Sequence, residues 1–278
     1  MENLESYSLT AEEMEHWEEY GFIIRKNVFT EDECMEFGQR AGELATGERP
    51  LPSENRRLNA LVESGEVTDR TGAGAMHSIT SPHLYDEIFL ERVRDPRVAD
   101  VVSGLIGPDL ASHNTLFIFK APGIGLPFPW HQDLWYFQKR FETETTVGTW
   151  QTVDDADTEN GCLRVIPGSH KWEVLEHDEL DGFQQQEFKL ARVPEGETGI
   201  PVEMPAGSVL WFHSRLLHRS THNHSDRFRR VYVAHYLSAL AVEKSVKWKP
   251  PPNLRVRGKT YPDCIRAEVE NVLPIPEE

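Results

Sequence analysis

The chain has 278 residues, of which 38% are hydrophobic, and its 46 acidic and 29 basic residues give a formal net charge of −17. That charge argues against nucleic acid and anionic membrane surfaces as partners, because both would repel the protein. The three separated cysteines contain no CxxC pair, and no basic leader or long apolar stretch is present, so we expect a soluble, cytoplasmic protein without disulfides or a zinc ribbon.

The first part of the chain, about residues 1–110, reads as mainly helical. Residues 10–13 fit a capping box, in which Thr10 caps an amide and Glu13 reaches back, and residues 30–33 repeat the pattern before a second helix. Between these helices, residues 21–24 form a short apolar run that predicts a strand. A third helix begins near Asp95-Pro96 and ends at Gly107. Residues 46–76 are polar and lack periodicity, which predicts a long, mobile loop.

From about residue 111 the sequence changes to short β-prone runs, at 115–119, 146–153, 163–166, 208–212 and 231–237. Short strands without intervening helices indicate a sandwich or barrel. We therefore expect one domain over residues 1–278, mainly β with flanking helices, with a core at about 111–240 and a C-terminal tail at 241–278. The acidic, irregular segment 171–200 is predicted to be an insertion over one mouth of the barrel.

A histidine and an aspartate two residues apart, His131 and Asp133, give the first indication of a metal site. Alternate side chains of an extended segment share a face, so both can reach one ion. They are the start of a facial triad of two histidines and one carboxylate, which leaves open positions that suit iron(II). Alone the triplet is weak, because it also occurs by chance in surface turns.

The second indication lies 87 residues further on, where an apolar strand leads to His218. Arg229 follows and opens another strand. An arginine suits a dicarboxylate, because its planar fork binds a carboxylate through two parallel hydrogen bonds. Iron would then chelate a 2-oxo acid while Arg229 holds the distal carboxylate.

Of the other histidines, His213, His222 and His224 are interpreted as structural, and His170 as part of a turn. His235 lies on a predicted strand, where we expect it to be buried and hydrogen-bonded.

Taken together, four motifs strongly resemble the phytanoyl-CoA dioxygenase family over roughly residues 15–240: HQDL at 131–134, ENGCL at 159–163, IPGSH at 166–170, and HRS at 218–220 with Arg229. The resemblance implies a double-stranded β-helix (jelly-roll, cupin-like) core. It also implies an enzyme that binds iron(II) and consumes 2-oxoglutarate and O2 to give succinate and CO2.

Residue by residue, the resemblance implies that His131, Asp133 and His218 ligate iron and that Arg229, assisted by Ser220, binds the distal carboxylate of 2-oxoglutarate. Further expected cosubstrate contacts are Trp150, Lys120 and Leu116. Related halogenases carry a small residue in place of the carboxylate ligand. Because Asp133 is present, the resemblance favours hydroxylation over halogenation.

The substrate is expected on the open side of the triad, near Gln132, Trp135, Tyr136, Phe137 and, from the end of the long loop, His77. Aromatic side chains more often fill a core, so for Trp135 and Tyr136 both interpretations stay open. Segments 46–76 and 171–200 are the lid candidates.

The sequence therefore predicts a dioxygenase that hydroxylates an unactivated C–H bond of a small-molecule metabolite. The same cofactors also support desaturation, epimerisation or ring formation, which the sequence does not separate. From another class, a catalytically silent jelly-roll that binds a metabolite remains as a rival, and so does a cupin-type hydrolase or isomerase with a different metal.

Overall fold

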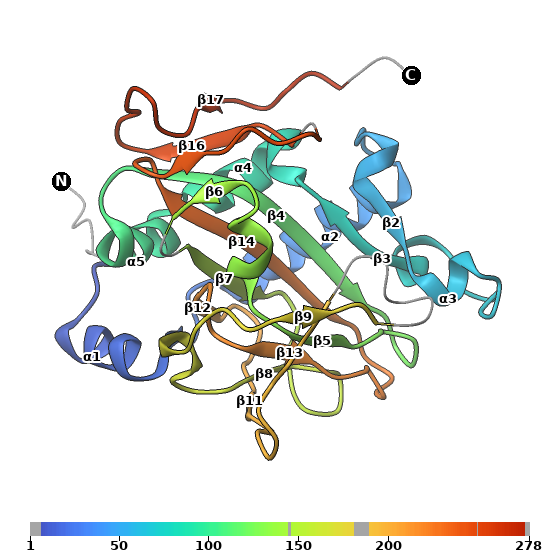
Figure 1. Ribbon diagram of the computed structural model, residues 1–278. Helices are drawn as coiled ribbons and strands as arrows, with labels where there is room; N and C mark the ends of the chain where they lie inside the picture. The colour runs from blue at the N-terminus through green and yellow to red at the C-terminus, as the bar shows by residue number, and fades with distance from the viewer. Residues whose placement is uncertain (1–6, 144–145, 181–188, 249, 276–278) are drawn as a thin grey trace.

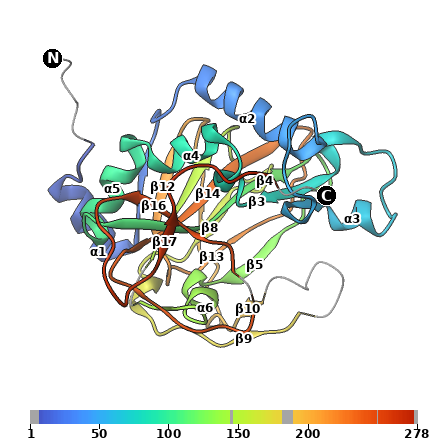
Figure 2. The same ribbon diagram turned by 90° about the horizontal axis from the view of Figure 1, so that it is seen from above.

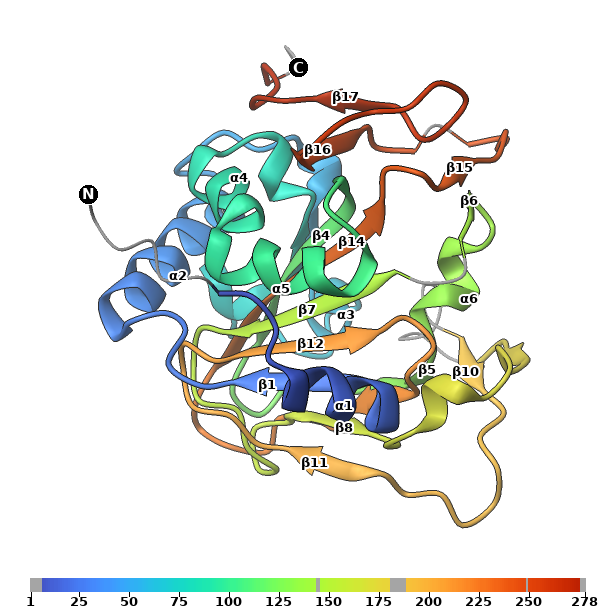
Figure 3. The ribbon, with the colours of Figure 1, turned by 90° about the vertical axis from the view of Figure 1, so that its left-hand side faces the viewer.

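Two antiparallel β-sheets lie face to face, and helices cover the outer face of the larger one. The computed structural model describes residues 7–143, 146–180, 189–248 and 250–275. In Figure 1 and Figure 3 the large sheet crosses the middle of the molecule, with the small sheet below it. Figure 2 shows α2, α4 and α5 along one side of the sheets.

The helices are α1 (Ala11–Tyr20), α2 (Glu31–Thr46), α3 (Ala60–Glu63), α4 (Glu87–Arg94), α5 (Pro96–Ile106) and α6 (Asp133–Phe137), with short 3-10 turns η1 (Ser53–Asn55), η2 (Gly72–Ala75), η3 (Pro82–Leu84) and η4 (Ser169–Lys171). The strands are β1 (Phe22–Arg25), β2 (Arg56–Leu58), β3 (Met76–Thr80), β4 (Leu110–Lys120), β5 (Phe128–His131), β6 (Phe141–Glu142), β7 (Val147–Thr152), β8 (Leu163–Val165), β9 (His177–Asp178), β10 (Leu190–Ala191), β11 (Ile200–Val202), β12 (Val209–His213), β13 (His218–Ser220), β14 (Arg229–Ser238), β15 (Val242–Glu243), β16 (Asn253–Arg257) and β17 (Ala267–Val269).

The large sheet follows the order β1-β12-β7-β14-β4-β16-β17, and β3 and β2 also join it through β4. Successive side chains of each strand point to opposite faces of the sheet, so the side chains enter two apolar layers in turn. On β14, Tyr232, Ala234 and Tyr236 pack into the core that α2, α4 and α5 complete. Val231 and Val233 face the other way, toward the small sheet.

The small sheet follows the order β11-β8-β13-β5. Leu163 and Val165 of β8 pack against Leu210 of β12 in a second core between the sheets. This pair of facing antiparallel sheets is the double-stranded β-helix predicted from the sequence.

The predicted start signals of the helices are confirmed. Both capping boxes form, with Thr10 accepting from the Glu13 amide at 3.1 Å and Thr30 from the Glu33 amide at 3.2 Å. Asp95 caps α5 through the Arg97 amide at 2.9 Å. The predicted strands are also found, as β1, β4, β7, β8, β12 and β14.

Two segments differ from the prediction. Residues 46–76 are not a featureless loop, because they contain β2 and α3, and the buried Asn59 side chain donates to the Ile124 carbonyl at 2.9 Å. Likewise the tail at 241–278 contributes β16, which pairs antiparallel with β4 and extends the large sheet. The strands β2 and β16 form by pairing with β3 and β4, and the local sequence does not mark such pairing.

Candidate metal centre and cosubstrate pocket

The two histidines of the expected triad are placed by strand register. His131 ends β5 and His218 begins β13, and the two residues are direct partners in the antiparallel pairing of these strands. Their ring centroids lie 4.1 Å apart. Both side chains are buried, so the register of one strand pair brings two imidazoles to the same point between the sheets.

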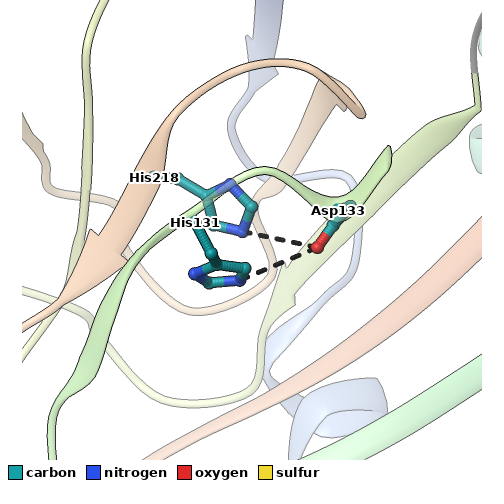
Figure 4. Close-up of side chains that lie close together, drawn as sticks. All are labelled: His131, Asp133 and His218. Atoms are coloured by element: carbon teal, nitrogen blue, oxygen red, sulfur yellow. Dashed lines mark ion pairs between the residues drawn. The ribbon is translucent and has the colours of Figure 1, made fainter. Parts of the chain in front are cut away.

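Asp133 follows an extended segment, as predicted, but starts a helix. His131 ends β5 and Gln132 is extended (φ −120°, ψ 125°), whereas Asp133 is the first residue of α6. The carboxylate still turns toward the histidines, with Oδ1 3.7 Å from His131 Nε2 and 3.8 Å from His218 Nε2. Figure 4 shows both rings facing this carboxylate.

The ligand atoms of the three side chains all lie within 4.8 Å of one another, and no other such group of three occurs among the described residues. Each imidazole also has its Nδ1 beside a carbonyl oxygen, that of Pro129 at 2.8 Å from His131 and that of Leu216 at 2.9 Å from His218. A carbonyl only accepts, so Nδ1 carries the proton and Nε2 keeps its lone pair for a metal. This donor set of two nitrogens and one oxygen suits iron(II).

Burial and mutual contact control the charges of these groups. Burial, with a contribution from His218, lowers the pKa of His131 to about 3, so the ring is a neutral ligand at neutral pH. Burial alone would raise the pKa of Asp133, but the three histidines around it outweigh burial, and the pKa lies below its ordinary value. The aspartate is therefore an anion, as a metal ligand must be.

Arg229, the predicted cosubstrate residue, lies at the start of β14 and lines the same cavity as the triad. The side chain is 1% exposed, and its Nε and Nη1 have no hydrogen-bond partner in the part of the chain that the structure describes. Burial lowers the pKa of Arg229 to about 9, which leaves the guanidinium charged at neutral pH. Unpaired buried donors are costly, and an anion entering the cavity would satisfy them.

Two further predicted cosubstrate residues lie beside Arg229, and a third lines the same cavity. The Trp150 ring lies 5.2 Å from the guanidinium carbon, Lys120 is the strand partner of Arg229, and Leu116 lines the cavity from β4. Lys120 is buried and donates to the Thr221 carbonyl, and its burial lowers the pKa of the ammonium. Ser220 is buried on β13, two residues after His218.

The two motifs between the metal residues are structural. Gly161 of ENGCL has φ +83°, and a Cβ there would lie 2.5 Å from the Thr221 oxygen that holds Lys120. In IPGSH, Ser169 accepts the Leu217 amide at 2.9 Å, immediately before His218. These contacts explain why a glycine and a serine are required at these positions.

The cavity has a volume of about 1190 Å³. Of the predicted substrate contacts, Tyr136, Phe137 and His77 line it. His77 stacks on Phe128 with ring centroids 5.3 Å apart.

Gln132 and Trp135 are not among the cavity-lining residues. Gln132 is fully buried, and its amide accepts from Leu175 N and donates to the Arg215 carbonyl, both at 2.8 Å. Its role is therefore to tie neighbouring segments to the metal motif. The Trp135 ring stacks instead on His177, at 4.8 Å.

The 171–200 segment lies beside the metal motif in its described parts: β9 pairs with β10, and the Lys189 amide donates to the Tyr136 hydroxyl at 2.9 Å. Its residues 181–188 lie outside the described residues, and the lid prediction for this segment falls partly on them.

Sequence reasoning missed two kinds of residue. His235 was expected only to be buried and hydrogen-bonded, and its partner proves to be Asp133, at 3.0 Å between Nε2 and Oδ2. The C-terminal residues Glu243, Pro250, Pro251, Pro252, Asn253, Arg266 and Leu273 also line the cavity. No local motif marks them, because strand pairing with β4 brings the C-terminal segment to the site.

Comparison with known proteins agrees with this geometry. Residues 17–231, more than half of the chain, match the model of the family described as phytanoyl-CoA dioxygenase (PhyH). The chain belongs to the phytanoyl-CoA dioxygenase family. One relative is the probable alpha-ketoglutarate-dependent hypophosphite dioxygenase of Stutzerimonas stutzeri, 27% identical over 82% of this chain and 79% of the relative. Another is the peroxisomal phytanoyl-CoA dioxygenase of Homo sapiens, which is 26% identical over 85% of this chain and 70% of that relative.

Among solved structures, EctD from S. alaskensis with 2-oxoglutarate and 5-hydroxyectoine aligns with a TM-score of 0.68 at 20% identity, covering 98% of this chain and 92% of that one. This likeness shows the shared fold. With its family, this protein is a dioxygenase whose cofactors are iron(II), 2-oxoglutarate and O2. No described helix is long and apolar enough to cross a membrane.

Replacing Ser169 by alanine tests the structural role of IPGSH. The Leu217 amide would stay buried without its acceptor, so we expect a loss of about 1–3 kcal/mol in the free energy of unfolding, measured by urea denaturation. Ser64→Ala is the control, because Ser64 accepts a backbone amide in the same way but at an exposed position. Equal losses in the two variants would contradict the role of Ser169.

Proposed function

We propose that this dioxygenase hydroxylates an unactivated C–H bond of a small organic metabolite. In the balanced reaction, substrate, 2-oxoglutarate and O2 give the alcohol, succinate and CO2. Iron(II), when bound, supplies the activation of O2, and this chain's residues place the cosubstrate and the substrate around it.

In this proposal His131, Asp133 and His218 ligate the metal, and Arg229 binds the distal carboxylate of 2-oxoglutarate. The observation that carries it is the buried Arg229 guanidinium in the cavity that the triad also lines, whose Nε and Nη1 have no partner among the described residues. A silent metabolite binder does not need a complete triad together with a charged arginine whose donors await an acceptor. Trp150 packs beside that arginine, which stays charged at neutral pH, so this part of the cavity favours a carboxylate of the cosubstrate.

The size and lining of the cavity support an organic substrate rather than a small oxyanion. A volume of about 1190 Å³ exceeds what 2-oxoglutarate alone fills, and ligand pockets for organic molecules usually measure about 300–1,000 Å³. Leu84, Tyr85, Phe128 and Tyr136 supply apolar and aromatic surface to it. We therefore propose a substrate with an apolar portion that packs on these side chains.

A screen of small metabolites under air, with iron(II) and 2-oxoglutarate, tests the proposed reaction. We expect one compound to increase succinate formation and to yield a product heavier by one oxygen atom, as mass spectrometry can measure. A product lighter by two hydrogen atoms would show desaturation or ring formation, and one of unchanged mass would show epimerisation; either would contradict hydroxylation. Succinate formation that persists in His131→Ala would contradict the metal site.

The C-terminal segment is proposed to form the wall that selects the substrate. The family match ends at residue 231, whereas residues 250–253 and Leu273 beyond it line the cavity. Arg140 is 8% exposed and lies three residues after α6, the helix that begins with Asp133. Its side chain connects this wall to that part of the chain. It donates to Glu243 at 2.7 Å, to the Pro251 carbonyl at 3.0 Å and to Asn253 at 3.1 Å.

Replacing Arg140 by glutamine should loosen this wall without touching the triad or Arg229. With the substrate found in the screen, we expect its KM to rise by about tenfold, equivalent to ~1.4 kcal/mol of binding, while the KM for 2-oxoglutarate stays unchanged. Arg94→Gln is the control, because Arg94 also anchors β16, by donating to the Arg255 carbonyl at 2.6 Å, but lies outside the cavity lining. Equal KM values for Arg140→Gln and the wild type would refute the proposed wall.

A further inference from the structure

One buried histidine outside the triad contacts the metal site directly. The Nε2 of His235 lies 3.0 Å from Asp133 Oδ2, whereas the other carboxylate oxygen, Oδ1, faces the two triad histidines. The two oxygens of one aspartate are thus directed to different partners.

The partner atoms determine the direction of this hydrogen bond. An ionised carboxylate only accepts, so His235 Nε2 must carry the proton and donate it. The opposite nitrogen, Nδ1, has no hydrogen-bond partner within the described residues, so the contact with Asp133 is the hydrogen bond that orients the ring.

Three neighbouring rings pack around His235. Phe137 meets it edge-on with centroids 4.8 Å apart, and His113 lies on another side at 5.9 Å. Phe212 approaches at 6.5 Å, and Gly148 leaves room for that ring, since a Cβ there would lie 2.3 Å from its Cζ. His235 itself is 4% exposed and lies within the longest strand pairing of the large sheet.

Asp133 needs such support more than the histidines do. His131 and His218 are fixed by the pairing of β5 with β13, but Asp133 belongs to neither sheet and begins a five-residue helix. Its backbone is tied to its surroundings through the next residue, whose amide donates to the Ser214 carbonyl at 2.9 Å. The contact with His235 connects the carboxylate to the large sheet.

We propose that His235 is a positioning residue for the metal centre: it holds Oδ2 of Asp133 and thereby presents Oδ1 alone to the iron. A single carboxylate oxygen from the protein keeps further coordination positions open for 2-oxoglutarate and O2. Because metal-ligating groups lose affinity when their hydrogen-bond partners are removed, the effect should appear in metal binding itself, before any turnover. This inference rests on the iron site proposed above.

The test compares substitutions that keep or remove the donor. In glutamine the amide nitrogen can occupy the place of Nε2, whereas the shorter asparagine does not reach Asp133 and leucine has no donor. We expect His235→Leu and His235→Asn to weaken iron(II) binding by ~10- to 100-fold, and His235→Gln to retain most of the wild-type affinity. Anaerobic calorimetric titration with iron(II) measures the dissociation constants, and near-infrared circular dichroism of the ligand-field bands reports the change in coordination.

His113→Leu is the matched control, because His113 is buried against His235 and Phe137, whereas the hydrogen bond to Asp133 comes from His235. The proposal is overturned if His235→Asn binds iron(II) like the wild type, if His235→Gln is impaired as much as His235→Asn, or if His113→Leu is impaired equally. Should the leucine variant not fold, the glutamine and asparagine pair alone decides. A wild-type protein that binds no iron(II) would instead contradict the metal centre itself.

Discussion

The pairing of β5 with β13 is the constraint on which the rest of the site depends. It sets His131 opposite His218, so the strand register alone brings the two residues side by side. The large sheet then supplies, from β14, both Arg229 and His235, which lie on the same face of one strand because six residues separate them. One sheet thus provides two of the proposed metal ligands, and the other provides the residues proposed to hold the cosubstrate and the third ligand.

The interior between the sheets combines apolar packing with charge that is left unsatisfied. Leu163, Val165 and Leu210 fill one part of it, while the Arg229 guanidinium places a buried cation in the same interior. Buried donors without partners each cost about 1–3 kcal/mol, so this region is less stable than an apolar core would be. A dianionic cosubstrate at the proposed site would offset that cost at Nε and Nη1 of Arg229, which have no partner among the described residues.

The sequence predicted the residues that a nearby motif or strand pattern marks, and it missed contacts between residues far apart in the chain. An apolar strand was predicted to lead to His218 and another to open at Arg229, and the family motifs named both together with His131. The extended spacing of His131 and Asp133 was predicted, but not the short helix that Asp133 begins, because five residues leave little periodicity. Gln132 was expected to contact the substrate, and its hydrogen bonds could not be predicted, since its partners lie 43 and 83 residues away. The contacts of His235 with Asp133 and of Arg140 with Asn253 span 102 and 113 residues, and only the folded chain shows them.

The most direct test of the metal and cosubstrate site is the visible spectrum of the metal-free protein after anaerobic addition of iron(II) and 2-oxoglutarate. A charge-transfer band should appear only when both are present. Arg229→Gln should need at least ~30-fold more 2-oxoglutarate to reach half of that band, whereas Arg230→Gln, whose side chain pairs with Asp154 at 2.7 Å, should behave like the wild type. No band in the wild-type protein, or the same 2-oxoglutarate requirement in Arg229→Gln, would contradict the site described above.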